Sequence, residues 1–431
     1  MSRVEDHSAP LRGRAVSRRA VLGGIGAAGA GAVLGGLAVS DLGGRADADT
    51  GAEANRAGVV AFHGRHQAGI ATPVQDRLLF GAFDVLPGVK RADLVALLKD
   101  WTGISATFAS GSEIGRNDVP PAPPDDTGEA LGLPASRLTI TFGFGPTLFT
   151  QDGADRFGIA RARPGALIDL PPFDHDNLDP SLSGGDIGVQ VCADDPQVTF
   201  HALRNLTRRG KGVVGLRWSQ LGFGRTSSTS RSQGTPRNLM GFKDGTNNVH
   251  GDDSHTMDDQ VWVGSGDSPA WMRGGSYLVA RRIRMRIESW DRDFLEDQEN
   301  VIGRLKATGA PLGQRHEFAK ADLTAKQGDG TPVIPEDAHI RLAAPAANDG
   351  AKLLRRGYSF TDGVDPRTAG LDAGLFFLAY QRDPRRQFVP IQRRLASQDA
   401  LNEYIEHTSS AIFAVPPGTS RGGWIGQTLF T

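Results

Sequence analysis

The chain has 431 residues, which is enough for about two or three ordinary domains. Its 48 lysine and arginine residues nearly balance 49 aspartate and glutamate residues, giving a formal net charge of −1, so no nucleic-acid partner and no electrostatic attraction to a membrane surface is predicted. Cys192 is the only cysteine, which excludes an intramolecular disulfide and any zinc or iron–sulfur site built from several of the chain's own thiolates.

The N-terminus reads as a targeting segment. Residues 17–22, Ser-Arg-Arg-Ala-Val-Leu, form a twin-arginine signal, and a weakly apolar Gly/Ala-rich run follows to about Val39. Residues 46–48, Ala-Asp-Ala, resemble a cleavage site, so we expect residues 1–48 to be a signal peptide that the twin-arginine export machinery recognises. The run is glycine-rich and barely long enough to span a bilayer, which disfavours a stable membrane anchor. The mature protein is therefore expected to be secreted or periplasmic.

After the signal, hydrophobic patterning predicts strands alternating with helices in a first half, residues 57–235. Long loops rich in Gly, Pro and Asp, residues 110–136 and 164–183, interrupt them. The order β-α-β followed by β-α-β is the ferredoxin-like split pattern. The expected elements are strands at 78–86, 138–144, 187–192 and 213–221, and helices at 91–102 and 197–207.

The same order of elements recurs in a second half, residues 236–431, although no sequence repeat links the halves. Two ferredoxin-like halves packed as a β-sandwich or barrel would give an α+β fold with peripheral helices and a cavity on one side. The expected elements are strands at 277–287, 358–360 and 375–381, a helix at 292–306, a packed segment around residue 339, and a helix from about Asp399 to His407.

Residues 336–360 offer one histidine within a short apolar segment, followed by an arginine pair. Because Ile340 and Leu342 follow His339, a packed element can hold its ring towards something buried, such as a metal or a haem iron. The alternative is a core histidine that bonds to a backbone carbonyl. The arginine pair that follows this histidine segment consists of Arg355 and Arg356.

A second stretch, residues 241–248, reads Gly-Phe-Lys-Asp-Gly-Thr-Asn-Asn and holds one carboxylate in a glycine-flanked turn. Gly241 and Gly245 permit positive φ and close backbone approach. Such a loop can press Asp244 against a flat ligand. The alternative is an ordinary Asp-Gly turn.

Together the two stretches resemble the dye-decolourising peroxidases, a family of haem enzymes. The family's Gly-x-x-Asp-Gly signature stands at 241–245, its proximal histidine segment at 338–342, and its distal arginine is the first of the pair in 354–358. Residues 62–70 match the secreted branch with the deferrochelatase-like members, and residues 376–384 give a further match. All of these motifs stand in the family's order.

The resemblance implies a peroxidase that uses hydrogen peroxide to oxidise dyes, phenols or other aromatic donors. It implies one haem b (heme b) per chain, bound in the second half with His339 as the metal ligand. Asp244 is the candidate acid–base group, and Arg355 the cation that steadies charge as the O–O bond breaks. Arg356 is expected at a haem propionate or on the surface. The other expected cofactor contacts are Gly241, Phe242, Lys243, Gly245, Thr246, Arg341 and Phe376, with Phe377 as the alternative to Phe376.

A proximal histidine should donate its other ring nitrogen to a carboxylate. Asp399 and Glu403 both qualify, because the expected last helix places them four apart on one face. Among the rival histidines, His316 is expected on the surface. His63 and His66 either lie near the haem edge or order the N-terminal segment. The candidate electron relays to bulky donors are Tyr358, Tyr380, Tyr404, Trp218 and Trp262.

Two other functions compete with this interpretation. A haem-handling protein in iron acquisition would bind haem at His339 without fast peroxide cleavage. A haem-free binding module would keep the fold but leave the combination of His339, Asp244 and Arg355 unexplained. The sequence leaves open the natural reductant and whether the protein is a monomer or a homo-oligomer.

Overall fold

The computed structural model describes residues 58–267 and 269–431. The expected signal peptide, residues 1–48, lies outside this range, so its prediction is untested. Within the described residues, no helix combines the length and the apolar character needed to cross a bilayer.

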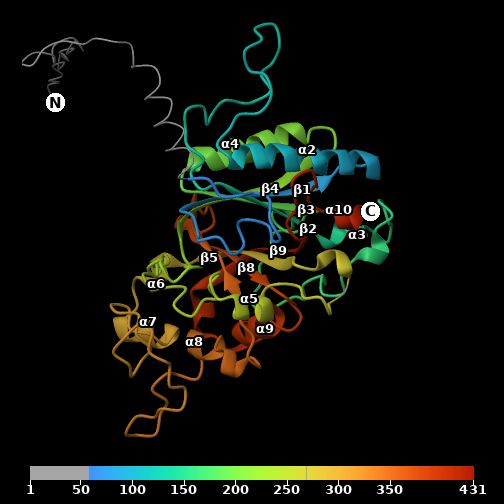
Figure 1. Ribbon diagram of the computed structural model, residues 1–431. Coiled ribbons are helices and arrows are strands. Elements are labelled where there is room, and N and C mark those ends of the chain that lie inside the picture. Colours follow the sequence, from blue (N-terminus) through green and yellow to red (C-terminus); the bar gives the residue numbers. More distant parts are fainter. Residues whose placement is uncertain (1–57, 268) are drawn as a thin grey trace, which may run out of the picture. The chain divides into compact units, whose positions relative to one another are not determined.

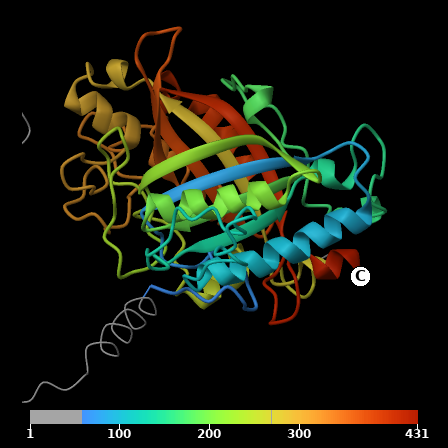
Figure 2. The ribbon, with the colours of Figure 1, turned by 90° about the horizontal axis from the view of Figure 1, so that it is seen from above.

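An antiparallel sheet organises the described chain, with strand order β5-β9-β2-β3-β1-β4-β7-β8-β6. Strand β5 also pairs with β8, so the sheet closes on itself as a barrel and leaves β6 as an extra strand beside β8 (Figures 1 and 2). The strands are β1 Arg77–Val85, β2 Thr139–Phe144, β3 Ile187–Ala193, β4 Val214–Arg225, β5 Ser276–Met285, β6 Leu354–Arg355, β7 Tyr358–Val364, β8 Leu371–Gln381 and β9 Ile405–Val415.

Both halves of the barrel repeat one strand order. The first half runs β2-β3-β1-β4 and the second runs β7-β8-β5-β9, so each places its second, third, first and fourth long strand in that sequence. The halves join edge to edge where β4 pairs with β7 and β2 with β9. The expected α+β fold of two ferredoxin-like halves is confirmed. The boundary between residues 235 and 236 stays a prediction, because Asp49–Thr431 forms one compact unit.

Two long helices cover the outer face of the first half. They are α2 Arg91–Ala109 and α4 Pro196–Arg209 (Figure 1). Helix α4 starts where the sequence dictates, because the Asp195 side chain accepts hydrogen bonds from the amides of Gln197 and Val198 and proline fills the first turn.

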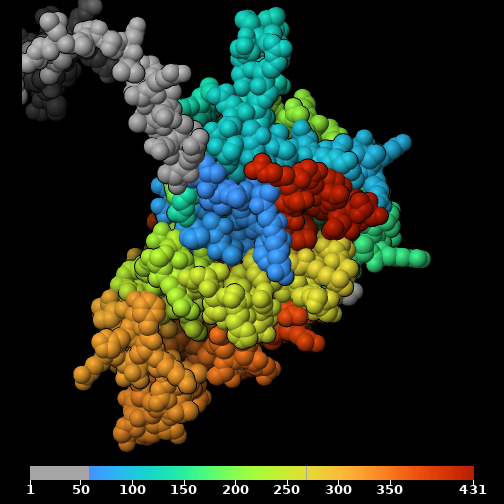
Figure 3. Space-filling view, in the orientation of Figure 1, coloured from blue at the N-terminus to red at the C-terminus, as the bar shows by residue number. Residues whose placement is uncertain are grey.

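Helices α5 to α9 lie on the opposite side of the sheet, over the second half, whereas α3 and α10 lie beside the strands of the first half (Figure 1). Figure 3 shows the segment between α7 and α8 (orange) projecting from this side as a separate lobe. The short helices of the described chain are α3 Pro146–Phe149, α5 Ser254–Gln260, α6 Ile287–Trp290, α7 Leu295–Ile302, α8 His339–Leu342, α9 Phe388–Gln398 and α10 Gln427–Phe430.

The last expected helix, from Asp399 to His407, is wrong. Helix α9 has already ended at Gln398, a 3-10 turn follows, and the chain then enters β9. The Asp399 side chain caps that turn by accepting a hydrogen bond from the Leu401 amide at 2.9 Å. The expected helix at 292–306 is also too long, because Gly303 adopts a left-handed φ of 85° and ends α7.

Successive residues of β8 point to opposite sides of the sheet. Phe376 packs inside the barrel, with its ring 5.6 Å from that of Phe80. Leu375 and Phe377 point outwards, and the Phe377 ring lies 6.3 Å from Phe388 of α9. Arg355 is paired with Ala379 of β8 and therefore shares the outward face with Leu375 and Phe377.

Candidate active site

His339 is the first residue of the four-residue helix α8, and its side chain is 35% exposed. Its Nδ1 lies 2.6 Å from Oδ2 of Asp399, which is 2% exposed. An ionised carboxylate only accepts hydrogen bonds, so Nδ1 carries the hydrogen, and in the neutral ring the lone pair is on Nε2. The Ala400 amide also donates to the Asp337 carbonyl at 3.1 Å, which ties the two segments together.

The charge on this imidazole responds to three neighbours. Burial disfavours the charged ring, but the carboxylate of Asp399 outweighs burial and raises the pKa of His339 above its ordinary value. Asp244 adds to this rise in pKa, and Arg355 opposes it. Two side chains from distant parts of the chain thus lie close enough to His339 to act on it electrostatically.

Asp244 and Arg355 form an ion pair, with Oδ1 of Asp244 2.6 Å from Nη1 of Arg355. Neither is sealed into the core, since their side chains are 14% and 28% exposed. Asn248 holds the backbone of Arg355 in place. Its Oδ1 accepts from the Arg355 amide at 2.8 Å, and its Nδ2 donates to the Arg355 carbonyl at 2.9 Å.

The role of Asn248 was not predicted. The residue stands in the same glycine-flanked stretch as Asp244, but its partner lies 107 positions further along the chain. Arg304 was not predicted either. Its Nη1 donates to the carbonyls of Gly309 and Glu317 at 2.7 and 3.1 Å. Burial lowers the pKa of Arg304, and the charge of Arg355 lowers it further, which places a second guanidinium near the ion pair.

The conformation of the Asp244 loop depends on Gly245. Its φ is +93°, and a Cβ added there would lie 2.9 Å from the Cα of Ser227. Other L-residues rarely adopt this φ, and the nearest obstacle is backbone that cannot swing away. Glycine is therefore required at this position for the loop to place Asp244 beside Arg355.

We expect Gly245→Ala to lower the free energy of unfolding by about 1–3 kcal/mol, because it combines left-handed strain with a backbone clash. Chemical denaturation of the purified variant measures the loss. Gly328→Ala is the matched control, since a Cβ there meets nothing within 4 Å and its φ is not positive. Equal stability of the two variants would show that the loop does not need glycine.

The remaining side chains of this loop have protein partners. Lys243 forms an ion pair with Glu317, and the Thr246 hydroxyl donates to the same carboxylate at 3.1 Å. Phe242 is 2% exposed, and its ring packs edge-on against Trp290 at 5.8 Å. These side chains brace the loop, whose one acidic side chain, Asp244, pairs with Arg355.

Comparison with known proteins decides the family. A family model described as Dyp-type peroxidase, N-terminal, matches residues 67–224, and one described as Dyp-type peroxidase, C-terminal, matches residues 235–420. This chain belongs to the Dyp-type peroxidase family. It is therefore a haem-dependent peroxidase, and hydrogen peroxide is the oxidant that the family implies.

Individual relatives agree with this assignment. The chain is 43% identical over 352 residues to a dye-decolorizing peroxidase from Thermobifida fusca, covering 80% of this chain and 77% of the relative. It is 40% identical over 363 residues to the deferrochelatase of Escherichia coli K12, covering 83% and 84%. The oxyferrous complex of DtpA from Streptomyces lividans superposes with a TM-score of 0.79 at 40% identity, covering 88% of this chain and 99% of that one.

Some residues expected at the cofactor of this Dyp-type peroxidase lie elsewhere. Phe376 was the wrong choice, because it points into the barrel and cannot wall the space that Arg355 faces. Phe377 shares the face of Arg355. Arg356 was expected at a propionate or on the surface, but it is fully buried and donates to the carbonyl of Thr72 and, at 2.7 Å, to Oε1 of Gln75.

Of the two carboxylates proposed behind His339, only Asp399 bonds to it. Glu403 is exposed, and no hydrogen bond joins it to His339, because the 3-10 turn replaces the helix on which both were expected. Arg341 directs Nε to the carbonyl of Pro335 at 2.9 Å and Nη2 to that of Ile334 at 2.6 Å. It therefore anchors the loop that precedes α8.

The rival histidines are separate from this group. His316 is exposed, as expected. His66 stacks on Trp262 at 3.8 Å, and its Nδ1 lies 2.6 Å from the Gly274 carbonyl. His63 faces a groove beside α2 that is described below. His66 therefore helps to order the N-terminal segment, and His339 alone among these histidines combines a carboxylate on Nδ1 with a nearby acid–arginine pair.

These residues fit a haem. Nε2 of His339 has no hydrogen-bond partner within the described chain, and Asp399 fixes the tautomer that leaves its lone pair available. A single imidazole is what haem iron needs from the protein, because the porphyrin supplies the in-plane ligands. The carboxylate behind the ring increases its basicity, as in other metal-ligating histidines.

We expect Asp399→Asn to weaken haem affinity or peroxidase activity by about 10–100-fold, since it keeps the shape but removes the charge behind His339. The iron–histidine stretching frequency of the haem-loaded protein should fall, which a merely structural role would not cause. Glu403→Gln is the matched control, because it neutralises an exposed carboxylate four residues away. An unchanged frequency in Asp399→Asn would contradict a role in tuning the imidazole.

Proposed function

We propose that this protein is an exported peroxidase that uses hydrogen peroxide to oxidise dyes, phenols or other aromatic donors. It would hold one haem b per chain through Nε2 of His339. One observation carries the proposal: an imidazole with Asp399 behind it lies near the Asp244–Arg355 pair. Export rests on the twin-arginine sequence alone.

The bound haem would supply the iron at which the O–O bond of hydrogen peroxide breaks. Asp399 orients the His339 ring and increases its basicity through the hydrogen bond at Nδ1. The Asp244 carboxylate can take a proton from the near oxygen of peroxide and return it to the leaving oxygen. The Arg355 guanidinium can stabilise negative charge on the departing oxygen. Asn248 holds the backbone of Arg355 in position through the hydrogen bond from the Arg355 amide.

The test is reconstitution of the purified mature chain with haem. We expect a Soret band that shifts on addition of peroxide, and peroxide-dependent bleaching of an anthraquinone dye. Folded protein that does not retain haem would overturn the proposal. The release of iron-free, fluorescent porphyrin without dye oxidation would instead favour the haem-handling alternative that the name of the Escherichia coli relative suggests.

Tyr404 is the best placed of the proposed electron relays. Its hydroxyl donates to the carboxylate of Asp293, and its ring packs edge-on against Trp290 at 5.0 Å. Trp290 in turn contacts Phe242 of the Asp244 loop. A phenol loses its proton when it is oxidised, and a carboxylate at the hydroxyl can receive it. Tyr404 is itself 6% exposed, whereas Tyr358 and Tyr380 are 0% exposed inside the barrel.

We expect Tyr404→Phe to lower the turnover of bulky dyes severalfold while small phenols, which can reach the haem directly, are oxidised at the wild-type rate. Steady-state assays with one donor of each size measure the split. Tyr277→Phe is the control, because this hydroxyl makes no hydrogen bond to a carboxylate among the described residues. If both variants oxidise the dye like the wild type, Tyr404 is only a packing residue.

A further inference from the structure

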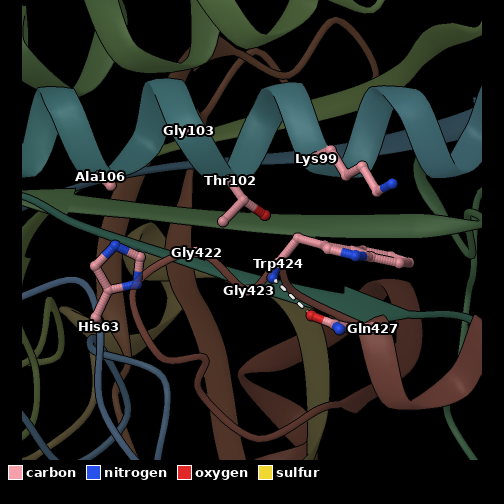
Figure 4. A pocket seen from close by; sticks show the side chains of 9 residues that line it. All are labelled: His63, Lys99, Thr102, Gly103, Ala106, Gly422, Gly423, Trp424 and Gln427. Carbon is pink, nitrogen blue, oxygen red and sulfur yellow. Dashed lines mark hydrogen bonds between the residues drawn. The ribbon is translucent and has the colours of Figure 1, made fainter. Parts of the chain in front are cut away.

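A surface groove of about 570 Å³ lies between helix α2 and the C-terminal segment, remote in sequence from every residue of the haem site. Figure 3 shows the C-terminal segment (red) lying against the blue and cyan N-terminal half. The two are joined because the Ile425 amide donates to Oγ1 of Thr102 at 3.1 Å, and Arg91 donates to the Phe430 carbonyl at 2.7 Å. The lining residues are His63, Lys99, Thr102, Gly103, Ala106, Gly422, Gly423, Trp424 and Gln427 (Figure 4).

The charge of the groove has one sign. None of its lining residues is acidic, and Lys99 contributes the ammonium group. The Lys99 ammonium lies 5.8 Å from the centre of the Trp424 ring and forms no salt bridge within the described chain. A cation beside an aromatic face favours a ligand that offers both a flat ring and a negative group.

The other end of the groove offers a hydrogen-bonding group that the fold does not use. Nδ1 of His63 is buried yet has no hydrogen-bond partner. In Figure 4 His63 lies at one end of the groove and Lys99 with Trp424 at the other. A buried polar nitrogen without a partner is costly. A ligand with a polar substituent at this end would relieve that cost.

The middle of the groove is open above two glycines. Gly103 and Gly422 both line it, and a Cβ added at either would meet no atom within 4 Å. Helix α2 gains no stability from glycine, which is less favourable in a helix than alanine by about 1 kcal/mol. Gly103 therefore lowers the stability of the helix and at the same time keeps the groove open.

We propose that this groove is a second binding site, which takes a planar aromatic anion. The ring lies over the glycines against Trp424, its carboxylate or sulfonate pairs with Lys99, and a hydroxyl or carbonyl at the far end bonds to His63. The site shares no residue with the haem site, so the inference goes beyond the proposed function and does not depend on it.

Equilibrium dialysis of the haem-loaded protein against 6-hydroxynaphthalene-2-sulfonate tests the proposal. We expect one saturable site. Lys99→Ala should weaken binding by about two- to fivefold, the equivalent of roughly 0.4–1 kcal/mol for an exposed ion pair. Gly103→Leu should abolish binding, because a Cβ at this position meets no atom within 4 Å and the rest of the side chain would extend into the groove. Lys211→Ala, which removes an exposed lysine outside the groove, is the control and should bind like the wild type.

Three results would overturn the proposal. One is the absence of saturable binding to the wild type. A second is wild-type affinity in Gly103→Leu, whose folding is checked by its thermal melt. The third is equal affinity for uncharged 2-naphthol, which would remove the role of Lys99. Binding that survives in Gly103→Leu but shifts the Soret band would place the probe at the haem instead.

Discussion

The His339→Ala variant is expected to lose stable haem binding and, with it, peroxidase activity. Alanine removes the nitrogen that Asp399 orients, and no other described histidine lies near the Asp244–Arg355 pair with a carboxylate behind its ring. The loss should exceed the roughly 10–100-fold cost of removing a mere supporting partner of a metal ligand. Haem content after gel filtration and the rate of peroxide-dependent dye oxidation measure it.

His316→Ala is the control for this variant, because that histidine is exposed and its ring makes no hydrogen bond to a carboxylate among the described residues. The His339 side chain is itself 35% exposed, so its truncation should leave the fold intact. The main structural cost is a buried Asp399 without its partner, about 1–3 kcal/mol. A His339→Ala protein that keeps its haem and turns over peroxide normally would show that another group binds the iron.

Replacing the acid–arginine pair is expected to slow peroxide cleavage without removing the haem. Asp244→Asn deletes the proton acceptor and should cost about 10²–10⁴-fold in rate. Arg355→Leu deletes the charge that stabilises the departing oxygen and should cost about 10²–10³-fold. Stopped-flow mixing of the haem-loaded variants with peroxide measures each step.

The double variant should be only slightly worse than the more impaired single variant. The two groups contact each other at 2.6 Å, and residues that act as a unit are not additive. Asp329→Asn, on an exposed loop, is the control. Wild-type peroxide turnover in both single variants would contradict the proposed roles and would favour a haem-handling protein.

The sequence predicted those site residues that lie within short, recognisable motifs. Gly245 needs a positive φ and close backbone approach, and both requirements can be read from a Gly-x-x-Asp-Gly stretch. The order of elements also predicted the two ferredoxin-like halves. It did not reveal that they meet at both edges, because the β4–β7 and β2–β9 pairings leave no local pattern in the chain.

The errors have physical causes. Phe376 and Phe377 are neighbours of one residue type, and only the pairing of Arg355 with Ala379 decides which one faces outwards. Strand β9 was missed because both of its faces are partly buried, so polar Thr408 and Ser409 interrupt any simple alternation. Helix α9 was missed because Pro390 resembles a helix breaker, although it stands in the first turn, where proline is tolerated.

The partners of buried charges were the least predictable feature. Arg355 and Arg356 are adjacent, yet one pairs with Asp244 on the outward face and the other is sealed inside the barrel by Thr72 and Gln75. Likewise, the sequence could not show which of Asp399 and Glu403 bonds to His339, because the 3-10 turn between them gives no sequence signal. Strand parity and turn geometry, which arise only in the folded chain, decide both cases.

A crystal structure of the haem-loaded protein tests the central claim most directly. The account predicts that Nε2 of His339 binds the iron, with Asp244 and Arg355 on the opposite face of the porphyrin. Iron bound by any other residue, or a porphyrin with all three side chains on one face, would contradict it.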